Sequence, residues 1–142
     1  MLKVKRLHPD AIIPTCANPG EDLAYDLYAL KETLLKPGQV EKVRTGIAAT
    51  FDDGSVKRWG LLVRDRSSMA AQGVTTSGGV IDAGYRGEIL VLLTSAESRL
   101  IKKGDKIAQM IPMPVATGAG VQEVDELAPA IRGANGFGST GR

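Results

Sequence analysis

The stretch that decides the fold is GVIDAGYRGE, residues 79–88. Its β-branched pair Val80-Ile81 predicts a strand that ends at Asp82. Ala83-Gly84 then favours a tight turn, and Tyr85 starts the return, so we expect a hairpin. The carboxylate of Asp82 could orient and deprotonate a water, and the ring of Tyr85 could pack against a planar or sugar ligand. The competing interpretation, an aspartate that only bonds turn amides, is the commoner situation for such a residue.

The sequence around this stretch reads as short strands. The 17 Gly and 7 Pro punctuate apolar runs that are too short for long helices, so we predict a mostly β protein. Residues 40–51 and 59–63 predict two strands joined by a turn at Asp52-Asp53-Gly54. Residues 88–94, EILVLLT, are apolar at nearly every position, which favours a strand buried on both faces at a sheet or subunit contact.

Two further segments carry local signals. Ile107, Met110 and Ile111 are apolar, but Pro112 and Pro114 follow them, so we expect an edge or crossover segment and not a central strand. Residues 67–72, SSMAAQ, begin with a serine and stop before a glycine, which predicts a helix of a turn or two.

Composition narrows the possible functions. At 142 residues the chain suits one domain, and its 18 Lys plus Arg are scattered among 16 Asp plus Glu. We therefore expect no polymeric nucleic-acid partner, although a small anionic ligand is possible. No apolar run suits a membrane span or a signal peptide, and Cys16 is the single cysteine, so we expect a cytoplasmic protein. The sequence offers no Cys/His metal site, so any metal should be a hard ion such as Mg²⁺ on oxygen ligands.

Two further positions carry charged side chains, and the first suggests an anion site. Arg66-Ser67-Ser68 opens the predicted helix, where hydroxyls, a guanidinium and free amides would point the same way. An ordinary serine cap beside a surface arginine explains the same residues. Asp26 lies between apolar strand residues, so burying it requires a cation or an arginine as partner. An exposed strand position is the alternative.

The C-terminal stretch 132–142, RGANGFGSTGR, has too few apolar groups to fold by burying itself, so we expect it to be mobile. Its glycines would let backbone N–H groups converge on an anion, and Arg132 and Ser139 would add donors. A tail without function is the alternative.

Five blocks occur together in one order along the chain. They are AYDL (24–27), DRSSMA (65–70), GVIDAGYRGE (79–88), GDKIAQ (104–109) and RGANGFGSTG (132–141). In this order and spacing the chain resembles the trimeric dUTPase family. Each block alone is a weak signal, so the specificity lies in the ordered set.

The resemblance implies an all-β, jelly-roll-like fold of the β-clip type with one short helix. It implies a β-domain over residues 1–131 and a lid over residues 132–142 that closes on the nucleotide. The implied assembly is a homotrimer whose active sites are shared between subunits. The implied reaction is Mg²⁺-dependent hydrolysis of dUTP to dUMP and pyrophosphate, which limits the dUTP level and supplies dUMP for dTMP synthesis.

The resemblance also implies a role for each site residue. Asp82 would activate the water that attacks the α-phosphorus, Tyr85 would pack under the deoxyribose and exclude ribonucleotides, and Asp26 would meet Mg²⁺ through water. The remaining substrate contacts would come from the backbone around Gly79, Val80 and Ile81, from Arg66, Ser67, Ser68 and Gln109, and in the tail from Arg132, Phe137, Gly138 and Ser139, with Phe137 stacked on uracil.

Four positions depart from the family's usual pattern: Ala24, Thr76, Gly84 and Asn135.

Two other functions compete with dUTP hydrolysis. A dCTP deaminase would need a glutamate where this chain has Leu92, which has no acid-base capacity. A non-catalytic nucleotide-sensing module would keep the pocket without turnover, and Asp82 argues against it.

Overall fold

The structure, a computed structural model, describes residues 1–134. These residues form short strands with one short helix, α1 (Ser67–Ala70), and one 3₁₀ turn, η1 (Thr117–Ala119). The strands are β1 (Leu2–Arg6), β2 (Tyr25–Tyr28), β3 (Thr33–Leu35), β4 (Glu41–Arg44), β5 (Ile47–Phe51), β6 (Trp59–Arg64), β7 (Val74–Ser77), β8 (Val80–Ile81), β9 (Leu90–Ser95), β10 (Arg99–Ile101) and β11 (Lys106–Pro114). The predicted β class and the predicted helix are both confirmed.

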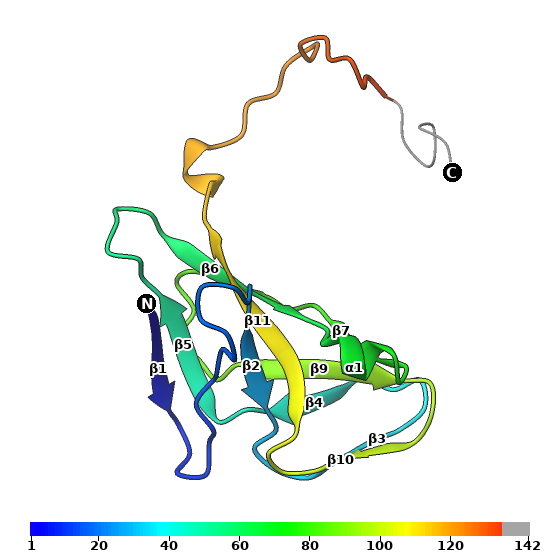
Figure 1. Ribbon diagram of the computed structural model, residues 1–142. Helices are drawn as coiled ribbons and strands as arrows, with labels where there is room; N and C mark the ends of the chain where they lie inside the picture. Colours follow the sequence, from blue (N-terminus) through cyan, green and yellow to red (C-terminus); the bar gives the residue numbers. More distant parts are fainter. Residues whose placement is uncertain (135–142) are drawn as a thin grey trace.

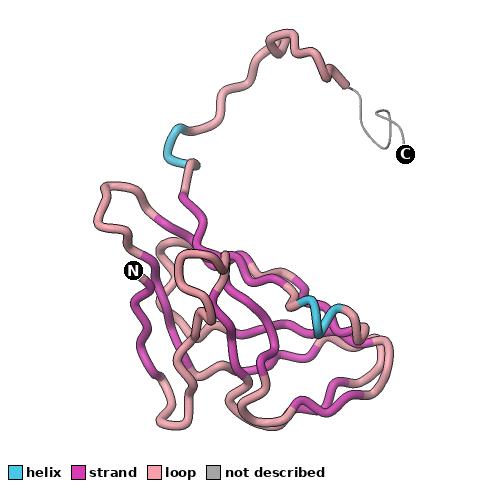
Figure 2. The backbone as a smooth tube through the Cα atoms, viewed as in Figure 1, coloured by secondary structure: helices cyan, strands magenta, loops and turns pink. Residues whose placement is uncertain are grey.

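The strands pair antiparallel in small sheets. The larger two have the orders β2-β11-β6-β8 and β4-β9-β7, and β1 pairs with β5 while β3 pairs with β10. Figure 2 shows these sheets wrapped around a common interior. No helix in the described part of the chain is long and apolar enough to cross a membrane.

One continuous core lies between the two larger sheets. Leu27, Val63 and Met110 enter it from the first sheet, and Val43 and Leu93 enter it from the second. All five side chains are at most 3% exposed. Since burying one such side chain stabilises a fold by roughly 1.5–3 kcal/mol, these sheets form a rigid frame for the loops between them.

The apolar strand β9 is buried on one face. Val91, Leu93 and Ser95 are buried, whereas Leu90 is 38% exposed and Leu92 is partly exposed. The expectation of burial on both faces is therefore wrong for the single chain. The cause is that the rest of the chain covers one side of the β4-β9-β7 sheet. Whether a second subunit covers the outer face stays a prediction.

The predicted strand over residues 40–51 is two strands. The break falls at Thr45-Gly46, where Gly46 has a φ of +71° and a Cβ atom would lie 2.9 Å from that of Ala11. The chain changes direction there, so β4 pairs with β9 and β5 pairs with β1. The predicted turn after β5 is present, with the Gly54 N–H donating to Asp52 Oδ1 at 2.8 Å.

The segment with two prolines is an interior strand of its sheet, contrary to the edge prediction. β11 pairs with β2 over residues 106–110 and with β6 over residues 109–114. Pro112 and Pro114 lie beyond the part that pairs with β2, so each proline has a strand on one side only. A proline is tolerated in that position because its missing N–H can face away from the neighbour.

The predicted hairpin at residues 79–88 is also wrong, although its turn is right. The N–H of Tyr85 donates to the Asp82 carbonyl at 2.9 Å, which closes a tight turn. The strand before the turn, β8, pairs with β6, and the chain after the turn continues into β9 in the other sheet. The turn therefore carries the chain from one sheet to the other.

The last described residues form an arm. The N–H of Val115 donates to the Arg58 carbonyl at 2.8 Å, and beyond it the chain extends away from the sheets (Figure 1). The arm side chains Val121 and Ile131 are fully exposed, at 103% and 109%.

Candidate functional site

The turn after β8 presents Asp82 to solvent at the rim of a cavity. Arg86 braces this turn, because its Nη1 donates to the carbonyls of Ala83 at 2.8 Å and Tyr85 at 2.7 Å. The cavity has a volume of about 380 Å³. We call it the Asp82 cavity; it is lined by Gly79, Val80, Ile81, Asp82, Tyr85, Glu88, Leu90 and Leu92.

The ring of Tyr85 is fixed against Gly87. Its hydroxyl donates to the Glu88 carbonyl at 3.0 Å, and a Cβ atom on Gly87 would lie 2.6 Å from the ring carbon Cζ. No side chain larger than hydrogen fits at Gly87 while the ring keeps this position. Because Tyr85 is still 44% exposed, its ring is held in place and remains accessible to a ligand.

Glu88 anchors the far end of this segment. Its carboxylate accepts two hydrogen bonds from Arg44 Nε, at 3.0 and 3.1 Å, and one from the Gly46 N–H at 2.8 Å. Arg44 is the last residue of β4 and Gly46 lies in the break that follows it, so Glu88 ties the turn to the second sheet. We did not predict this anchor, because its partners lie 44 and 42 residues away in the sequence.

Gly79 allows β8 to approach β6. Its φ is +91°, and a Cβ atom there would lie 2.5 Å from the Val63 carbonyl oxygen. The N–H of Val63 in turn donates to the Gly79 carbonyl at 2.7 Å. The position therefore combines a left-handed backbone with a close backbone contact, and only glycine satisfies both.

We expect Gly79→Ala to lower the free energy of unfolding by roughly 3–4 kcal/mol, since it adds a backbone clash to left-handed strain. Gly78→Ala is the matched control, because Gly78 also has a positive φ, +70°, but its Cβ would meet only Leu92 Cδ1 at 3.7 Å. Its expected loss is about 1 kcal/mol. Urea unfolding of both variants measures the difference, and equal losses would contradict the close contact.

A second cavity lies on another part of the molecule. Its volume is about 360 Å³. We call it the Arg66 cavity; it is lined by Ala17, Asp22, Leu23, Ala24, Asp26, Arg66, Ser67, Lys106 and Gln109. Four residues predicted from the sequence, Asp26, Arg66, Ser67 and Gln109, therefore meet there. Ser68 does not line this cavity, and its Oγ accepts a hydrogen bond from Arg66 Nη1 at 3.4 Å.

Asp26 has the cationic partner that its apolar neighbours required. Its Oδ1 accepts from Arg66 Nε at 2.9 Å, and its Oδ2 is 2.7 Å from Lys106 Nζ. The hydrogen bond and then the charge of Asp26 raise the pKa of Lys106 above its usual value. The prediction of a paired, largely buried Asp26 is confirmed, since its side chain is 17% exposed. Lys106 itself was not predicted, although it stands in the GDKIAQ block.

Asp65 holds the back of this cavity together. Its backbone carbonyl accepts from Gln109 Nε2 at 2.7 Å, and its Oδ1 accepts from both the N–H and the hydroxyl of Thr76 at 2.6 Å. Thr76, one of the departures from the family pattern, is therefore well paired here. The contact fixes β7 and β11 against the end of β6.

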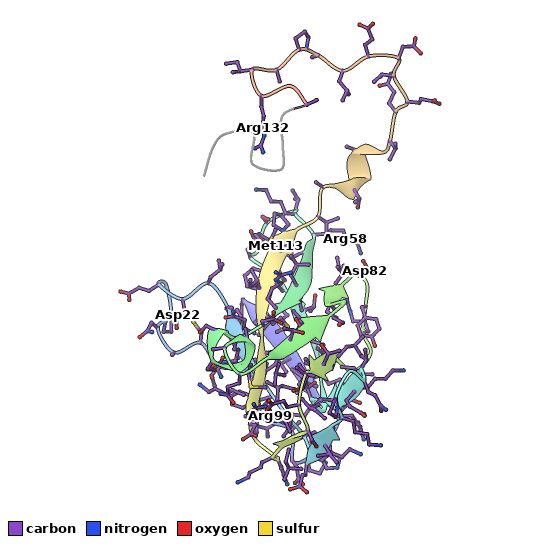
Figure 3. The ribbon with its side chains drawn as sticks, turned by 90° about the vertical axis from the view of Figure 1, so that its right-hand side faces the viewer. Asp22, Arg58, Asp82, Arg99, Met113 and Arg132 are labelled. Carbon is purple, nitrogen blue, oxygen red and sulfur yellow. The ribbon has the colours of Figure 1, made fainter. Side chains whose placement is uncertain are left out.

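The two cavities share no residue and face different directions. β6 and β8 are antiparallel, and Leu61 lies opposite Ile81. Asp82, the next residue after Ile81, therefore lies beside Gly60. Arg66 lies six residues further along the chain from Gly60, which corresponds to about 20 Å in an extended strand. Figure 3 shows Asp82 and Asp22, a residue of the Arg66 cavity, on opposite sides of the ribbon. Within one chain, these two sets of side chains cannot contact the same small ligand.

The remaining predicted residues belong to the C-terminal stretch. Arg132 lies on the arm, and Phe137, Gly138 and Ser139 fall outside the described residues. Residues 1–134 hold no group of three or more His, Cys, Asp or Glu that could cage a metal ion.

Comparison with known proteins gives a consistent result. The dUTPase family profile matches residues 10–141. The chain is 41% identical to a deoxyuridine 5'-triphosphate nucleotidohydrolase of Thermobifida fusca, over 99% of this chain and 78% of the relative. It is 43% identical to the protein of that name from Clostridium kluyveri, over 99% and 97% of the two chains. The solved structure of the Staphylococcus bacteriophage 80alpha dUTPase with dUPNHPP has a TM-score of 0.82 at 25% identity, over 100% of this chain and 99% of that one. The expected jelly-roll-like fold is thereby confirmed.

Proposed function

Because the chain belongs to the dUTPase family, we propose that it hydrolyses dUTP to dUMP and pyrophosphate, with Mg²⁺ bound to the triphosphate. In the cell this reaction limits the dUTP level and supplies dUMP for dTMP synthesis. The observation that carries the proposal is the Asp82 cavity, where one exposed carboxylate stands beside a fixed aromatic ring and an open backbone edge.

The backbone of β8 is suited to read the edge of uracil. β8 is the outermost strand of its sheet, so its second edge has no neighbouring strand within the described residues. Such an edge offers N–H donors and C=O acceptors in a fixed order, as uracil requires. The close contact at Gly79 fixes this edge, and the ring of Tyr85 provides the surface under the deoxyribose.

Asp82 acts as the general base. Its carboxylate takes a proton from a water molecule, whose oxygen forms a bond to the α-phosphorus. The bond from the α-phosphorus to the oxygen that bridges to the β-phosphate breaks, and pyrophosphate leaves. A positioned carboxylate of this kind typically contributes about 10²–10⁴-fold to the rate.

The complete site requires more than one copy of the chain. The triphosphate donors lie in the Arg66 cavity, whereas the base stands in the Asp82 cavity. We propose a homotrimer in which the Arg66 cavity of one subunit faces the Asp82 cavity of another. The partly exposed Leu90 and Leu92 on the outer face of β9 supply an apolar surface for this contact.

The side chains of the Arg66 cavity fit a metal that is held mainly by phosphate. Both oxygens of Asp26 already face cations, but each carboxylate oxygen has a second lone pair, so Asp26 can still accept a hydrogen bond from a metal-bound water. In such sites Mg²⁺ retains most of its water shell, and its other ligands are phosphate oxygens. Asp26 would hold the ion through water.

Two further parts of the proposal concern residues 132–142 and the compartment. We place residues 132–142 as a lid that closes over the bound nucleotide, with Arg132 and Ser139 on phosphate oxygens and Phe137 on uracil. Closure would exclude water and strengthen the charged contacts.

The single cysteine, Cys16, suits a reducing cytoplasm.

The competing functions lack the groups that they need. A deaminase requires a second acid in the Asp82 cavity, but Leu92 is apolar and the carboxylate of Glu88 is engaged by Arg44 and Gly46. A nucleotide-sensing module without turnover has no need for a general base at the cavity rim. The exposed carboxylate of Asp82 at this rim therefore favours an enzyme.

The direct test is an assay of the purified protein with dUTP, dCTP, dTTP and UTP, scored for pyrophosphate and for ammonia. We expect pyrophosphate from dUTP at a kcat/KM at least about 100-fold above that for the other three. The backbone edge should reject cytosine, the lack of space beyond it should reject the methyl group of thymine, and the sugar-packing ring should reject the ribose of UTP. EDTA should remove the activity without changing the unfolding temperature, since residues 1–134 hold no metal cage. Ammonia from dCTP, or no turnover of dUTP, would overturn the proposal.

A further inference from the structure

Lys106 places a cation in the Arg66 cavity. It begins β11 and lines the cavity together with Arg66, Ser67 and Gln109. Its Nζ is 2.7 Å from Asp26 Oδ2 and 5.9 Å from the centroid of the Tyr28 ring. These two contacts hold the end of a long side chain that is still 40% exposed.

The charges in this part of the cavity do not cancel locally. One carboxylate, Asp26, faces two cations, Arg66 and Lys106, so the three side chains together carry one excess positive charge. The second acid of the cavity, Asp22, is directed into its own loop, where Oδ2 accepts from the Asn18 N–H at 2.8 Å. The pKa of Lys106 is raised above its usual value, so its ammonium is charged at neutral pH, where a triphosphate is also ionised.

The two cations differ in how many protein acceptors they have. Arg66 donates through Nε to Asp26, and through Nη1 to Ser68 Oγ and to the Lys106 carbonyl, both at 3.4 Å. The ammonium of Lys106 has three N–H donors, and Asp26 is the one acceptor found for it in the described part of the chain. A guanidinium has five N–H donors, so Arg66 and Lys106 each keep about two donors beyond these contacts, and Lys106 is as able as Arg66 to bind an added anion.

From this arrangement we infer that Lys106 is a further phosphate-binding residue of the nucleotide site, held in position by Asp26. The inference rests on the proposed function and extends it. The α-phosphate must lie beside Asp82, so the phosphates beyond it are the ones that reach the Arg66 cavity. Lys106 would thus contribute to triphosphate binding and little to the binding of a monophosphate.

The test is equilibrium binding of dUMP, dUDP and the non-hydrolysable analogue dUpNHpp, with Mg²⁺, measured by calorimetry. Lys106→Met should lower the affinity for dUpNHpp by about 10- to 100-fold, as expected for a lost charge-assisted hydrogen bond. The affinity for dUDP should fall by less. The affinity for dUMP should stay within about twofold of that of the parent protein. Lys106→Arg should keep most of the affinity for dUpNHpp because it keeps the charge.

Lys103→Met is the matched control. Lys103 is also an exposed lysine in an ion pair with an aspartate, Asp10 at 2.8 Å, but it does not line the cavity. Its affinity for all three nucleotides should match the parent protein. Thermal unfolding of each variant separates lost contacts from lost folding.

Several results would overturn the inference. If Lys106→Met weakens dUMP as much as dUpNHpp, Lys106 acts on the whole site through Asp26 and not on the outer phosphates. If the variant binds dUpNHpp as tightly as the parent, Lys106 has no phosphate role. In both cases the parent protein binds dUpNHpp and the proposed function stands; a parent that binds no deoxyuridine nucleotide removes the proposed function as well.

Discussion

Asp82→Asn should bind dUTP with nearly unchanged affinity and lose turnover by about 10²–10⁴-fold, because an amide cannot accept the proton that the attacking water must lose. The side chain keeps its shape and one of its two acceptor oxygens, and the other oxygen becomes an NH2 donor. Since Asp82 is exposed, the free energy of unfolding should change by no more than about 0.5 kcal/mol. The measurement is kcat at saturating dUTP. The affinity for dUpNHpp, measured in parallel, shows whether the cavity is intact.

Glu97→Gln is a suitable control for this variant. It removes one negative charge from an exposed position outside both cavities, so its kcat should equal that of the parent. A kcat for Asp82→Asn similar to that of Glu97→Gln would take the general-base role away from Asp82. Another acid would then have to be found near the bound nucleotide.

Much of the site could be predicted where the signal was local. The apolar neighbours of Asp26 predicted a cationic partner, and two cations contact it. Ser67 predicted the start of a helix, and α1 begins there, although the predicted serine cap is wrong, because Arg66 is the N-cap residue and no side chain caps the helix. In both cases a few adjacent residues fix the backbone conformation or the cost of burial, so the neighbours alone are informative.

The pairing of strands could not be predicted in the same way. The turn at residues 82–85 was right, but the partner of β8 is β6, which precedes it by some twenty residues. The prolines of β11 suggested an edge because nothing in the sequence shows that β2 pairs only with the first half of that strand. The strands β3 and β10, each of three residues, are too short to show a period.

The anchoring contacts were missed for a related reason. Glu88 reads as a surface acid, and its role appears once the fold brings Arg44 and Gly46 to it. Lys106 reads as a turn lysine until Asp26 is placed beside it. Each is a contact between distant segments, which sequence periodicity does not record.

The arm and the separated cavities point to the same conclusion about assembly. The arm exposes Val121 and Ile131 fully and extends beyond the sheets, so these side chains have no cover within the described residues of one chain (Figure 1). Asp82 follows β8 beside one end of β6, and Arg66 follows the other end of β6, about 20 Å away in an extended chain. A site shared between copies resolves both observations.

The most direct test of this shared site is to co-express Asp82→Asn with Arg66→Ala and to measure dUTP hydrolysis by the mixed assemblies. Each variant alone should be nearly inactive. In a random trimer, a site that takes Asp82 from one subunit and Arg66 from another is intact in about a quarter of cases, so we expect roughly a quarter of the parent activity. Activity in the mixture no higher than in the separate variants would contradict the shared site, because it would place both residues on the same subunit.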